Sequence, residues 1–279
     1  MSKKYKRIVD LLEKAMESEQ SWRKTWQSQS RLHCNFVSKR PYSGTNQLTT
    51  MLSSHISEFK SHYWVTYKQA TETFGKSVKG LKSTPAIFFG NGIDEDTDKI
   101  YRFAKVYNLF NIEQIGIDPP EIEHRVSSLE DPYELPRSMG ITIEEDESFN
   151  PCYLPLKDTI RMPQPSQFVS DHEFCSALYH ECSHGTGHSK RLNRDLTGKF
   201  GDEDYAKEEL VAELSAVFLC AELGVKYDLQ NHASYLKSWQ KAIRSDARYV
   251  LTAASDARKA SEYCISQLNL VRKYEEKVA

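Results

Sequence analysis

The stretch His180-Glu181-Cys182-Ser183-His184 reads H-E-x-x-H. An apolar-periodic run precedes it and Gly185-Thr186-Gly187 follows, so we expect a helix that ends just beyond the second histidine. Residues four apart share one face of a helix, and both imidazoles would therefore point to one place, with Glu181 beside them. Histidines in this spacing are typical zinc ligands, and the glutamate can take a proton from water. The stretch predicts a hydrolytic metal site; the alternative is a chance match on a solvated polar helix.

A catalytic zinc ion commonly takes three protein ligands. The best third candidate is Glu209, in a segment from 205 to 223 whose apolar residues mark a largely buried helix. Glu209 and Glu213 lie four apart on a face of small side chains without lysine or arginine, where like charges repel. A metal ion and its histidines would supply the missing positive charge. We expect Glu209 to be a ligand and Glu213 to orient a ligand histidine; the alternative is a solvated acidic helix face.

Three further residues are candidates for contact with substrate or with the developing oxyanion. His188 falls short of the longer H-E-x-x-H-x-x-G-x-x-H spacing, whose third histidine would fall at Lys190, so it is the less favoured ligand. The other candidates are Tyr153 and Tyr205, and the sequence does not choose among the three. Cys182 lies on the opposite side of the helix from His180, and we expect it in the core.

The chemistry that these residues predict is metal-assisted hydrolysis of an amide. Glu181 would accept a proton from water and pass it to the leaving amine. A strand expected at 160–162 is ended by Pro163, which favours a sheet edge where an extended peptide could pair. The metal could be zinc or another divalent ion such as Mn²⁺, because histidine and carboxylate ligands accept several.

The net charge of −2 at pH 7 conceals an asymmetry along the 279 residues. Residues 1–90 carry 15 Lys and Arg against 6 Asp and Glu, a balance of +9. Subtraction from the totals of 37 and 39 leaves 22 against 33, or −11, for residues 91–279. The basic front half favours a polyanionic partner.

The cysteines and the N-terminal residues indicate the cellular compartment. Six scattered cysteines with no C-x-x-C pair are typical of free thiols in a reducing environment. The basic N-terminus runs into an amphipathic segment rather than an apolar one, and no apolar run reaches membrane-spanning length. We therefore expect a cytoplasmic protein that does not bind a membrane.

Periodicity predicts an α+β fold with two domains, a small α+β N-terminal one and a mainly helical C-terminal one with a short sheet. The expected domains are 1–117 and 139–279, joined by a proline-rich, acidic linker at 118–138. The front half should contain helices at 3–20 and 47–59, a strand turning into helix at 64–70, and paired strands at 86–89 and 101–112. The back half should contain short strands at 141–143, 152–155 and 159–163, and helices at 171–184, 205–223, 231–244 and 247–274.

Motifs along nearly the whole chain resemble those of one family. They are residues 41–46, 64–70, 78–80 with Lys82, and 107–114 in the front half, and residues 159–163, 180–188 with 191–192, 200–203 and 205–214 in the back half. Together they are specific, and on them the chain resembles the ArdC-type antirestriction proteins of conjugative plasmids and mobile elements. Departures are Cys182-Ser183, where the family is expected to have Leu-Thr, and an acidic turn after Phe89.

The resemblance implies an N-terminal domain that binds single-stranded DNA and a C-terminal zincin-like metallopeptidase domain, which together protect incoming DNA from host restriction. It supports the metal roles of His180, His184 and Glu209 and the general-base role of Glu181. The candidate DNA contacts are Trp22, Lys39, Arg40, Tyr42, Asn46, Trp64, Lys79 and Lys82. Two alternatives stay open: a DNA-binding shield with a structural metal, and a metallopeptidase that cleaves a repressor.

Overall fold

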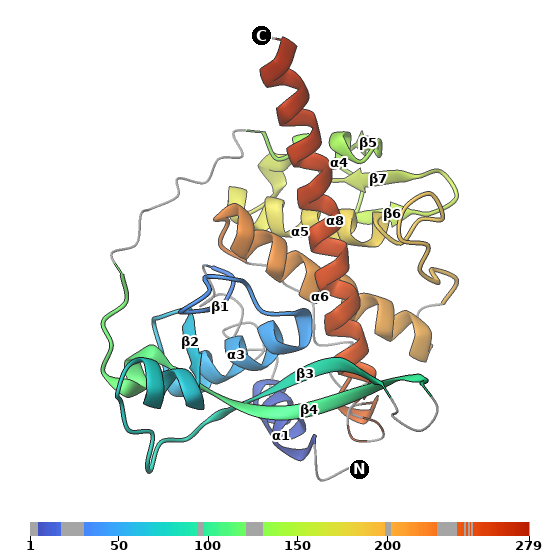
Figure 1. Ribbon diagram of the computed structural model, residues 1–279. Coiled ribbons are helices and arrows are strands. Elements are labelled where there is room, and N and C mark those ends of the chain that lie inside the picture. Colours follow the sequence, from blue (N-terminus) through green and yellow to red (C-terminus); the bar gives the residue numbers. More distant parts are fainter. Residues whose placement is uncertain are drawn as a thin grey trace.

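The computed structural model describes residues 5–17, 31–93, 98–120, 131–198, 202–227, 239–242, 244, 246 and 248–278, and of Arg102 and 271–278 the backbone alone. Figure 1 shows the N-terminal half in the lower part of the view and the C-terminal half in the upper part. One long helix, α8 (Arg248–Val278), runs past both halves. The α+β class and the two-domain organisation are as the sequence predicts.

A four-stranded sheet forms the N-terminal half, with strand order β1-β2-β4-β3. β1 and β2 are parallel, and the other pairs are antiparallel. The expected pairing of 86–89 with 101–112 is confirmed, within a longer hairpin whose register runs from Thr84↔Leu109 to Ile93↔Ile100. The strands are β1 (Cys34–Asn35), β2 (Tyr63–Thr66), β3 (Thr84–Ile93) and β4 (Ile100–Asn111).

Helices pack against this sheet. α1 (Lys6–Ala15) is amphipathic and buries one apolar face, and α3 (Gly44–Ser57) is buried over most of its length. Asn46 of α3 bonds through its side-chain amide to both the N–H and the C=O of Ile87, at 2.7 and 2.9 Å, and so occupies part of the free edge of β3. Short helices follow β2 and β4: η1 (Gln69–Thr73), a π-helix, and η2 (Ile112–Ile115), a 3₁₀-helix.

The C-terminal half contains a three-stranded sheet of order β5-β7-β6. Its strands are β5 (Thr142–Glu145), β6 (Cys152–Leu154) and β7 (Thr159–Met162), and η3 (Pro165–Gln167) follows. The expectation that strand 160–162 lies at a sheet edge is wrong, because β7 pairs with both neighbours. Pro163 follows the last paired residue, so its missing N–H removes no bond from the ladder. The edges are β5 and β6.

Three long helices cover this sheet and one another: α5 (Asp171–Gly185), α6 (Glu203–Leu223) and α8. Each begins and ends within two residues of the expected bounds, except for the C-terminus of α8. The helix expected at 231–244 lies mostly outside the described residues, of which 239–242 and 244 are helical.

One continuous core joins the two halves. Its buried side chains come from α1, α3, α5, α6 and α8, and include Leu48, Leu178 and Leu214, all fully buried. α3 meets α8 so closely that a Cβ at Gly44 would lie 1.8 Å from the carbonyl oxygen of Ala254. This contact requires glycine.

The segment expected as a linker, 118–138, is partly outside the described residues. Within it, α4 (Glu134–Ser138) is helical, its Leu135 is fully buried, and it contacts α8 and β5. The domain bounds 1–117 and 139–279 stay predictions.

Candidate metal centre

Helix α5 presents both histidines because of its local sequence. The Ser170 hydroxyl accepts a hydrogen bond from the N–H of Glu173 at 3.2 Å, and acidic side chains occupy the first turn, where they complement the helix dipole. The C-terminal half of the helix is buried, and this includes every residue from 176 to 183. His180 and His184, one turn apart, face α6, and their ring centroids are 4.8 Å apart.

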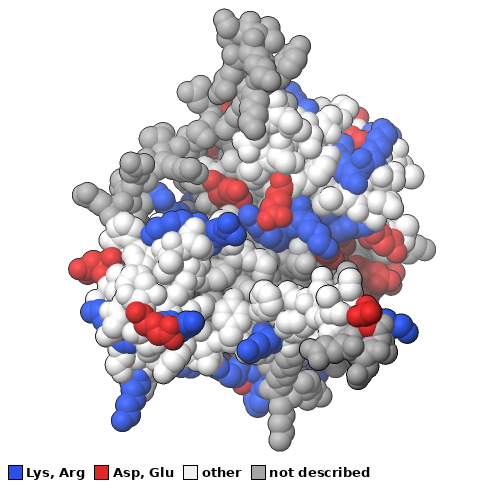
Figure 2. Space-filling view, in the orientation of Figure 1, with Lys and Arg blue, Asp and Glu red and all other residues white. Residues whose placement is uncertain are grey.

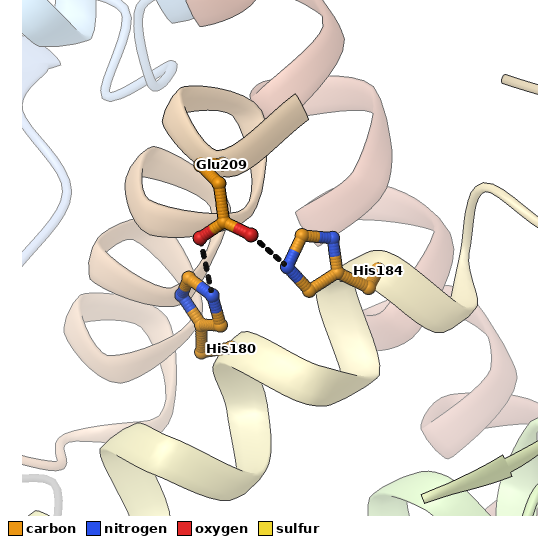
Figure 3. Close-up of side chains that lie close together, drawn as sticks. All are labelled: His180, His184 and Glu209. Atoms are coloured by element: carbon orange, nitrogen blue, oxygen red, sulfur yellow. Dashed lines mark ion pairs between the residues drawn. The ribbon is translucent and has the colours of Figure 1, made fainter. Parts of the chain in front are cut away.

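Helix α6 brings a carboxylate to these rings. Small side chains at Ala206, Ala212 and Ala216 let neighbouring helices approach closely, and Gly224 ends the helix with a φ of +72°. Glu209 is 8% exposed and points to the two histidines (Figure 3). Its two oxygens are used separately: Oε2 lies 3.5 Å from Nε2 of His180, and Oε1 lies 3.5 Å from Nε2 of His184.

These three side chains fit a divalent metal ion. Each offers a ligand atom, and the three atoms lie within 4.8 Å of one another. Nitrogen and oxygen ligands at about 2.0–2.2 Å from a tetrahedral ion are separated from each other by roughly 3.4 Å, close to the separations seen here. Two histidines and a glutamate also match the ligand types of catalytic zinc sites.

The electrostatics show that the site favours positive charge. Burial disfavours protonation of His184, but hydrogen bonds to Glu208 and Glu209 outweigh it and raise the pKa of His184 to about 10. The same balance of burial against the bond to Glu209 raises the pKa of His180. Burial opposes ionisation of Glu209, yet the two histidines hold its pKa well below the usual range. The carboxylates around the two imidazoles thus favour a positive charge at this place, as a divalent cation would supply.

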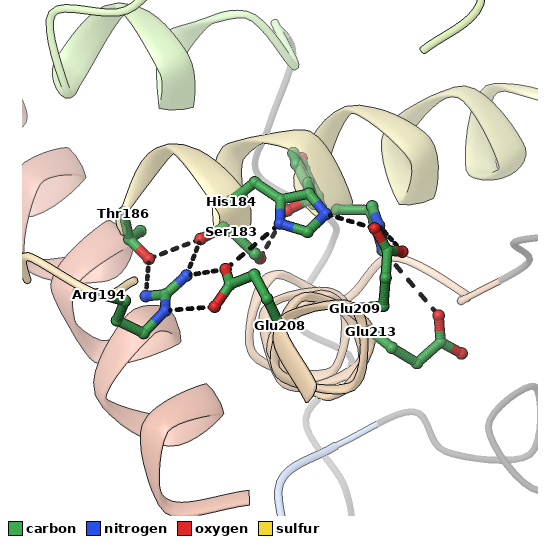
Figure 4. Close-up of polar contacts among 9 residues, drawn as sticks. Ser183, His184, Thr186, Arg194, Glu208, Glu209 and Glu213 are labelled. Carbon is green, nitrogen blue, oxygen red and sulfur yellow. Dashed lines mark hydrogen bonds and ion pairs between the residues drawn. The ribbon is translucent and has the colours of Figure 1, made fainter. Parts of the chain in front are cut away.

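Glu208 and Arg194 complete the site, and sequence reasoning missed both. Oε1 of Glu208 lies 3.3 Å from Nδ1 of His184, on the ring nitrogen that Glu209 does not use. Arg194 donates to both oxygens of Glu208, at 2.6 and 3.0 Å, and also to Oγ1 of Thr186 and the carbonyl of Ser183 (Figure 4). Neither residue stands in a recognisable spacing, because Arg194 lies in an irregular loop after α5 and meets Glu208 of α6 only in the folded chain.

Glu213 lies on the side of His180 where we expected an orienting carboxylate. Its Oε2 is 4.0 Å from Nδ1 of His180, and its side chain is 1% exposed. Nδ1 of His180 is buried and has no hydrogen-bond partner among the described residues. The separation exceeds hydrogen-bond length, so the orienting role of Glu213 stays a prediction.

Glu181, the expected general base, is 7% exposed. Burial, with a contribution from the charge of Glu181, raises the pKa of the Cys152 thiol in β6, and the same charge favours the protonated form of His180. Glu181 therefore lies within electrostatic range of both residues. Cys182 is fully buried in the core, as expected.

The proposed substrate contacts have different surroundings. The hydroxyl of Tyr153 donates to Oδ1 of Asp158 at 2.8 Å, so its proton is directed to that carboxylate. His188 is half-buried, and its Nδ1 accepts from the N–H of Lys190 at 3.2 Å. Tyr205 is half-buried in the first turn of α6. Their roles stay predictions.

A second pair fixes the end of α5, and it too was missed. Arg191 donates to both oxygens of Asp158, at 2.8 and 3.0 Å, and to the carbonyls of Gly185 and Met139, at 3.0 and 2.9 Å. Its side chain is 4% exposed. The pair ties the residues after the second histidine to the turn between β6 and β7.

The candidate DNA contacts divide into exposed and buried residues. Trp22 lies outside the described residues. Trp64 is fully buried and its indole N–H donates to Nδ1 of His33 at 3.0 Å, and Asn46 is buried against Ile87. Both therefore have core roles, and we correct their assignment as DNA contacts. Tyr42 is half-buried, and Lys39, Arg40, Lys79 and Lys82 are exposed.

None of the six cysteines forms a disulfide. Among the helices that the structure describes, none combines the length and the apolar character that a bilayer span needs.

Two family models match the chain. The model of a zincin-like metallopeptidase covers residues 133–256, and the model of the N-terminal domain of the anti-restriction factor ArdC covers residues 2–110. Among curated proteins, the uncharacterized protein y4eC of Sinorhizobium fredii (strain NBRC 101917 / NGR234) is 31% identical over 282 residues, which are 94% of this chain and 92% of y4eC. The DNA primase TraC of Escherichia coli is 32% identical over 282 residues and 92% of this chain, but the chain spans only 26% of that primase.

Two solved structures share the fold. The metal-free crystal structure of the antirestriction protein ArdC from the R388 plasmid has a TM-score of 0.76 and 32% sequence identity, and the match covers 93% of this chain and 97% of that one. The Mn(II)-bound structure of the same protein has a TM-score of 0.75 and 30% identity with the same coverage.

Proposed function

Because the chain belongs to the ArdC family of antirestriction proteins and contains a zincin-like domain, we propose that it binds single-stranded DNA and hydrolyses peptide bonds at a divalent-metal site. In this proposal His180, His184 and Glu209 hold the metal and Glu181 is the general base. The biological role is protection of incoming mobile-element DNA in the cytoplasm, where the six cysteines stay reduced.

One observation carries the hydrolytic half: two imidazole nitrogens from α5 converge, at 3.5 Å each, on the two oxygens of one buried carboxylate from α6. Three ionisable groups are rarely gathered in a core without a cation to balance them. The Mn(II)-bound structure of the R388 relative supports a divalent ion here, and the ligand set also suits zinc.

A bound divalent ion would act as a Lewis acid on the scissile carbonyl and make water easier to deprotonate. Glu181 would accept the proton from water and deliver it to the leaving amine. Glu208 and Glu213 would keep the two imidazoles oriented with Nε2 toward Glu209, since a carboxylate on the other ring nitrogen fixes the tautomer. The buried surroundings of Glu181 and Glu209 strengthen every charge interaction in the site.

The peptide would add to the edge of β6. This strand pairs with β7 on one side only, contacts α5, and places Cys152 within the electrostatic influence of Glu181. An extended peptide pairing with β6 would pass beside the histidine pair. His188, Tyr153 and Tyr205 remain the proposed contacts to the substrate or to the oxyanion.

The DNA half of the proposal rests on charge. Residues 1–90 have a charge balance of +9, and Lys39, Arg40, Lys79 and Lys82 are exposed on loops of this half. Such cations would contact phosphates and make binding depend on salt concentration.

Three proteins test the hydrolytic half: wild type, Glu181→Gln and Glu209→Gln, each assayed for metal content and for cleavage of a fluorogenic peptide library. We expect Glu181→Gln to keep the metal and to lose about 10²–10⁴-fold in cleavage rate. Glu209→Gln should lose the metal as well. Full cleavage by Glu181→Gln would refute the assignment.

The same variants separate a peptidase from a shield. Transfer of an unmodified plasmid into a restricting host measures protection. If proteolysis produces the effect, Glu181→Gln should abolish protection while the wild-type affinity for single-stranded DNA remains. Full protection by Glu181→Gln would instead identify a DNA-binding shield with a structural metal.

A further inference from the structure

The β3–β4 hairpin exposes an unusual number of large apolar side chains. Beyond Ile87, which is buried, the large side chains face solvent, while Ala104 of β4 still packs against the core. Those exposed are Phe88 (55%), Phe89 (59%), Ile93 (65%), Ile100 (73%), Tyr101 (52%) and Phe103 (38%). Figure 2 shows that much of the surface in the lower part of the molecule is uncharged, with both basic and acidic side chains at its margins. Large apolar side chains gathered on an exposed surface often mark a binding site.

The strand register places three aromatic rings on one face. Residues that pair directly point to the same side, so Phe88 shares a face with Lys105, Phe103 with Gly90, and Tyr101 with Gly92. Ring centroids of Phe88 and Phe103 are 6.1 Å apart, and those of Phe103 and Tyr101 are 6.3 Å apart. We call Phe88, Phe103 and Tyr101 the aromatic row.

Two glycines hold the aromatic row in place. A Cβ added at Gly90 would lie 2.7 Å from the Phe103 ring, and one added at Gly92 would lie 2.6 Å from the Tyr101 ring. Each ring therefore covers the opposing glycine, as aromatic side chains do when they stabilise a glycine across a strand pair. Each close contact limits the positions open to its ring, which lowers the entropy lost on binding.

Charged side chains lie at both ends of the aromatic row. Lys105 pairs opposite Phe88 and is exposed, so a cation lies at the inner end, on the same face as the rings. At the outer end the described charged residues are Asp98 and Lys99, one of each sign and both exposed. Lys105 is therefore the cation placed beside the rings, where it can contact a phosphate.

The spacing of the rings distinguishes two forms of nucleic acid. Stacked bases rise about 3.4 Å per nucleotide, so rings just over 6 Å apart match one base per ring in an extended, unstacked strand. A duplex presents the edges of its bases and keeps their faces covered. Aromatic rings bind bases through their faces.

We propose that the aromatic row is a stacking platform for the bases of single-stranded DNA, with Lys105 in contact with a phosphate. This inference rests on the proposed single-stranded-DNA binding and locates it on the hairpin. In this proposal the rings provide the part of the DNA affinity that does not depend on salt concentration. The exposed lysines provide the part that does.

Fluorescence anisotropy of a labelled oligothymidylate, measured at several salt concentrations, tests the proposal with the full chain. We expect Tyr101→Leu and Phe103→Leu each to weaken binding about tenfold with an unchanged salt slope, because stacking releases no counterions. Lys105→Gln should lower the salt slope by about one. Ile100→Ala, on the other face of the same hairpin, is the matched control and should bind as the wild type does.

Gly92→Ala adds a second variant that keeps all three rings and displaces Tyr101; it should weaken binding in the same direction as Tyr101→Leu. The side chains of Ile100, Tyr101, Phe103 and Lys105 are exposed, and circular dichroism would show that the fold is kept in every variant.

Each outcome has a distinct meaning. If the double variant Tyr101→Leu/Phe103→Leu binds like the wild type while Lys79→Gln/Lys82→Gln weakens binding, the platform is refuted and the proposed function stands. If the wild type does not bind the oligonucleotide at all, the proposed function fails and the inference fails with it. If the ring variants change the oligomeric state in light scattering and leave DNA binding intact, the aromatic row is an interface between two copies, which also refutes the platform.

Discussion

Oε1 of Glu208 lies 3.3 Å from Nδ1 of His184, so the imidazole is held between two carboxylates of neighbouring residues, Glu208 on Nδ1 and Glu209 on Nε2. A helix turns about 100° per residue, and the two side chains leave α6 in different directions. The two carboxylates reach opposite nitrogens of the His184 ring because α5 packs across the part of α6 that carries Glu208 and Glu209. Arg194 neutralises Glu208, so His184 has a fixed acceptor whose charge is already balanced.

The first prediction concerns that acceptor. Glu208→Gln should weaken Zn²⁺ and Mn²⁺ binding about 10–100-fold, the usual effect of losing the partner that orients a ligand histidine. Titration calorimetry of the metal-free protein measures it. Glu203→Gln, in the exposed first turn of the same helix, is the control and should leave the affinity unchanged. Equal affinities in the two variants would show that Glu208 does not act on the metal.

The second prediction concerns the buried pair of Arg191 and Asp158. Arg191→Met leaves the Asp158 carboxylate without its bidentate partner and should lower the free energy of unfolding by about 3–5 kcal/mol. Urea denaturation measures the change. The exposed pair of Lys6 and Asp10 supplies the comparison: Lys6→Met should cost less than about 1 kcal/mol. Similar losses in both variants would contradict a special role for the buried pair.

The third prediction follows from His33, whose Nδ1 accepts the indole N–H of Trp64. Burial, aided by the charge of His62, lowers the pKa of His33 to about 3 from an ordinary 6.5. Between those values the unfolded chain binds the proton and the folded chain does not, so stability falls as pH decreases through this window. The loss is about 1.4 kcal/mol per pH unit at most.

This pH dependence can be checked with the variant His33→Asn, because asparagine can keep the hydrogen-bond acceptor and does not titrate. The free energy of unfolding would be measured for the wild type and the variant from about pH 7 to pH 4. The variant should show a flatter decline on the acid side. Parallel curves would mean that His33 does not contribute.

The fourth prediction concerns the contact between the two halves. Gly44→Ala places a Cβ 1.8 Å from the carbonyl oxygen of Ala254, so α3 and α8 must separate. Overpacking of this kind costs about 1–3 kcal/mol or more. Thermal melting should show a single transition at lower temperature, whereas Ser57→Ala at the exposed end of α3 should change stability by less than about 0.5 kcal/mol. An unchanged melting temperature in Gly44→Ala would show that the interface tolerates displacement.

Local sequence predicted a large share of this protein. The helices at 171–184 and 205–223 and the hairpin of 86–89 with 101–112 were recognisable because hydrophobic periodicity reports which face of an element is buried. The spacing of His180 and His184 fixed their common direction for the same reason. Glu209 was identified as their partner because unpaired carboxylates on an apolar helix require a compensating charge.

What depended on tertiary structure is where the elements meet. Sequence does not encode strand order locally, so β7 was expected at an edge and lies in the middle of its sheet. It does not reveal that Trp64 and Asn46 turn inward, or that Arg194 returns from a loop to balance Glu208. Periodicity records which face of a segment is buried, and tertiary packing decides which other segment covers that face. The histidine pair could therefore be predicted from five residues, while the residues around it come from two further segments, α6 and the loop with Arg194, which only the fold brings together.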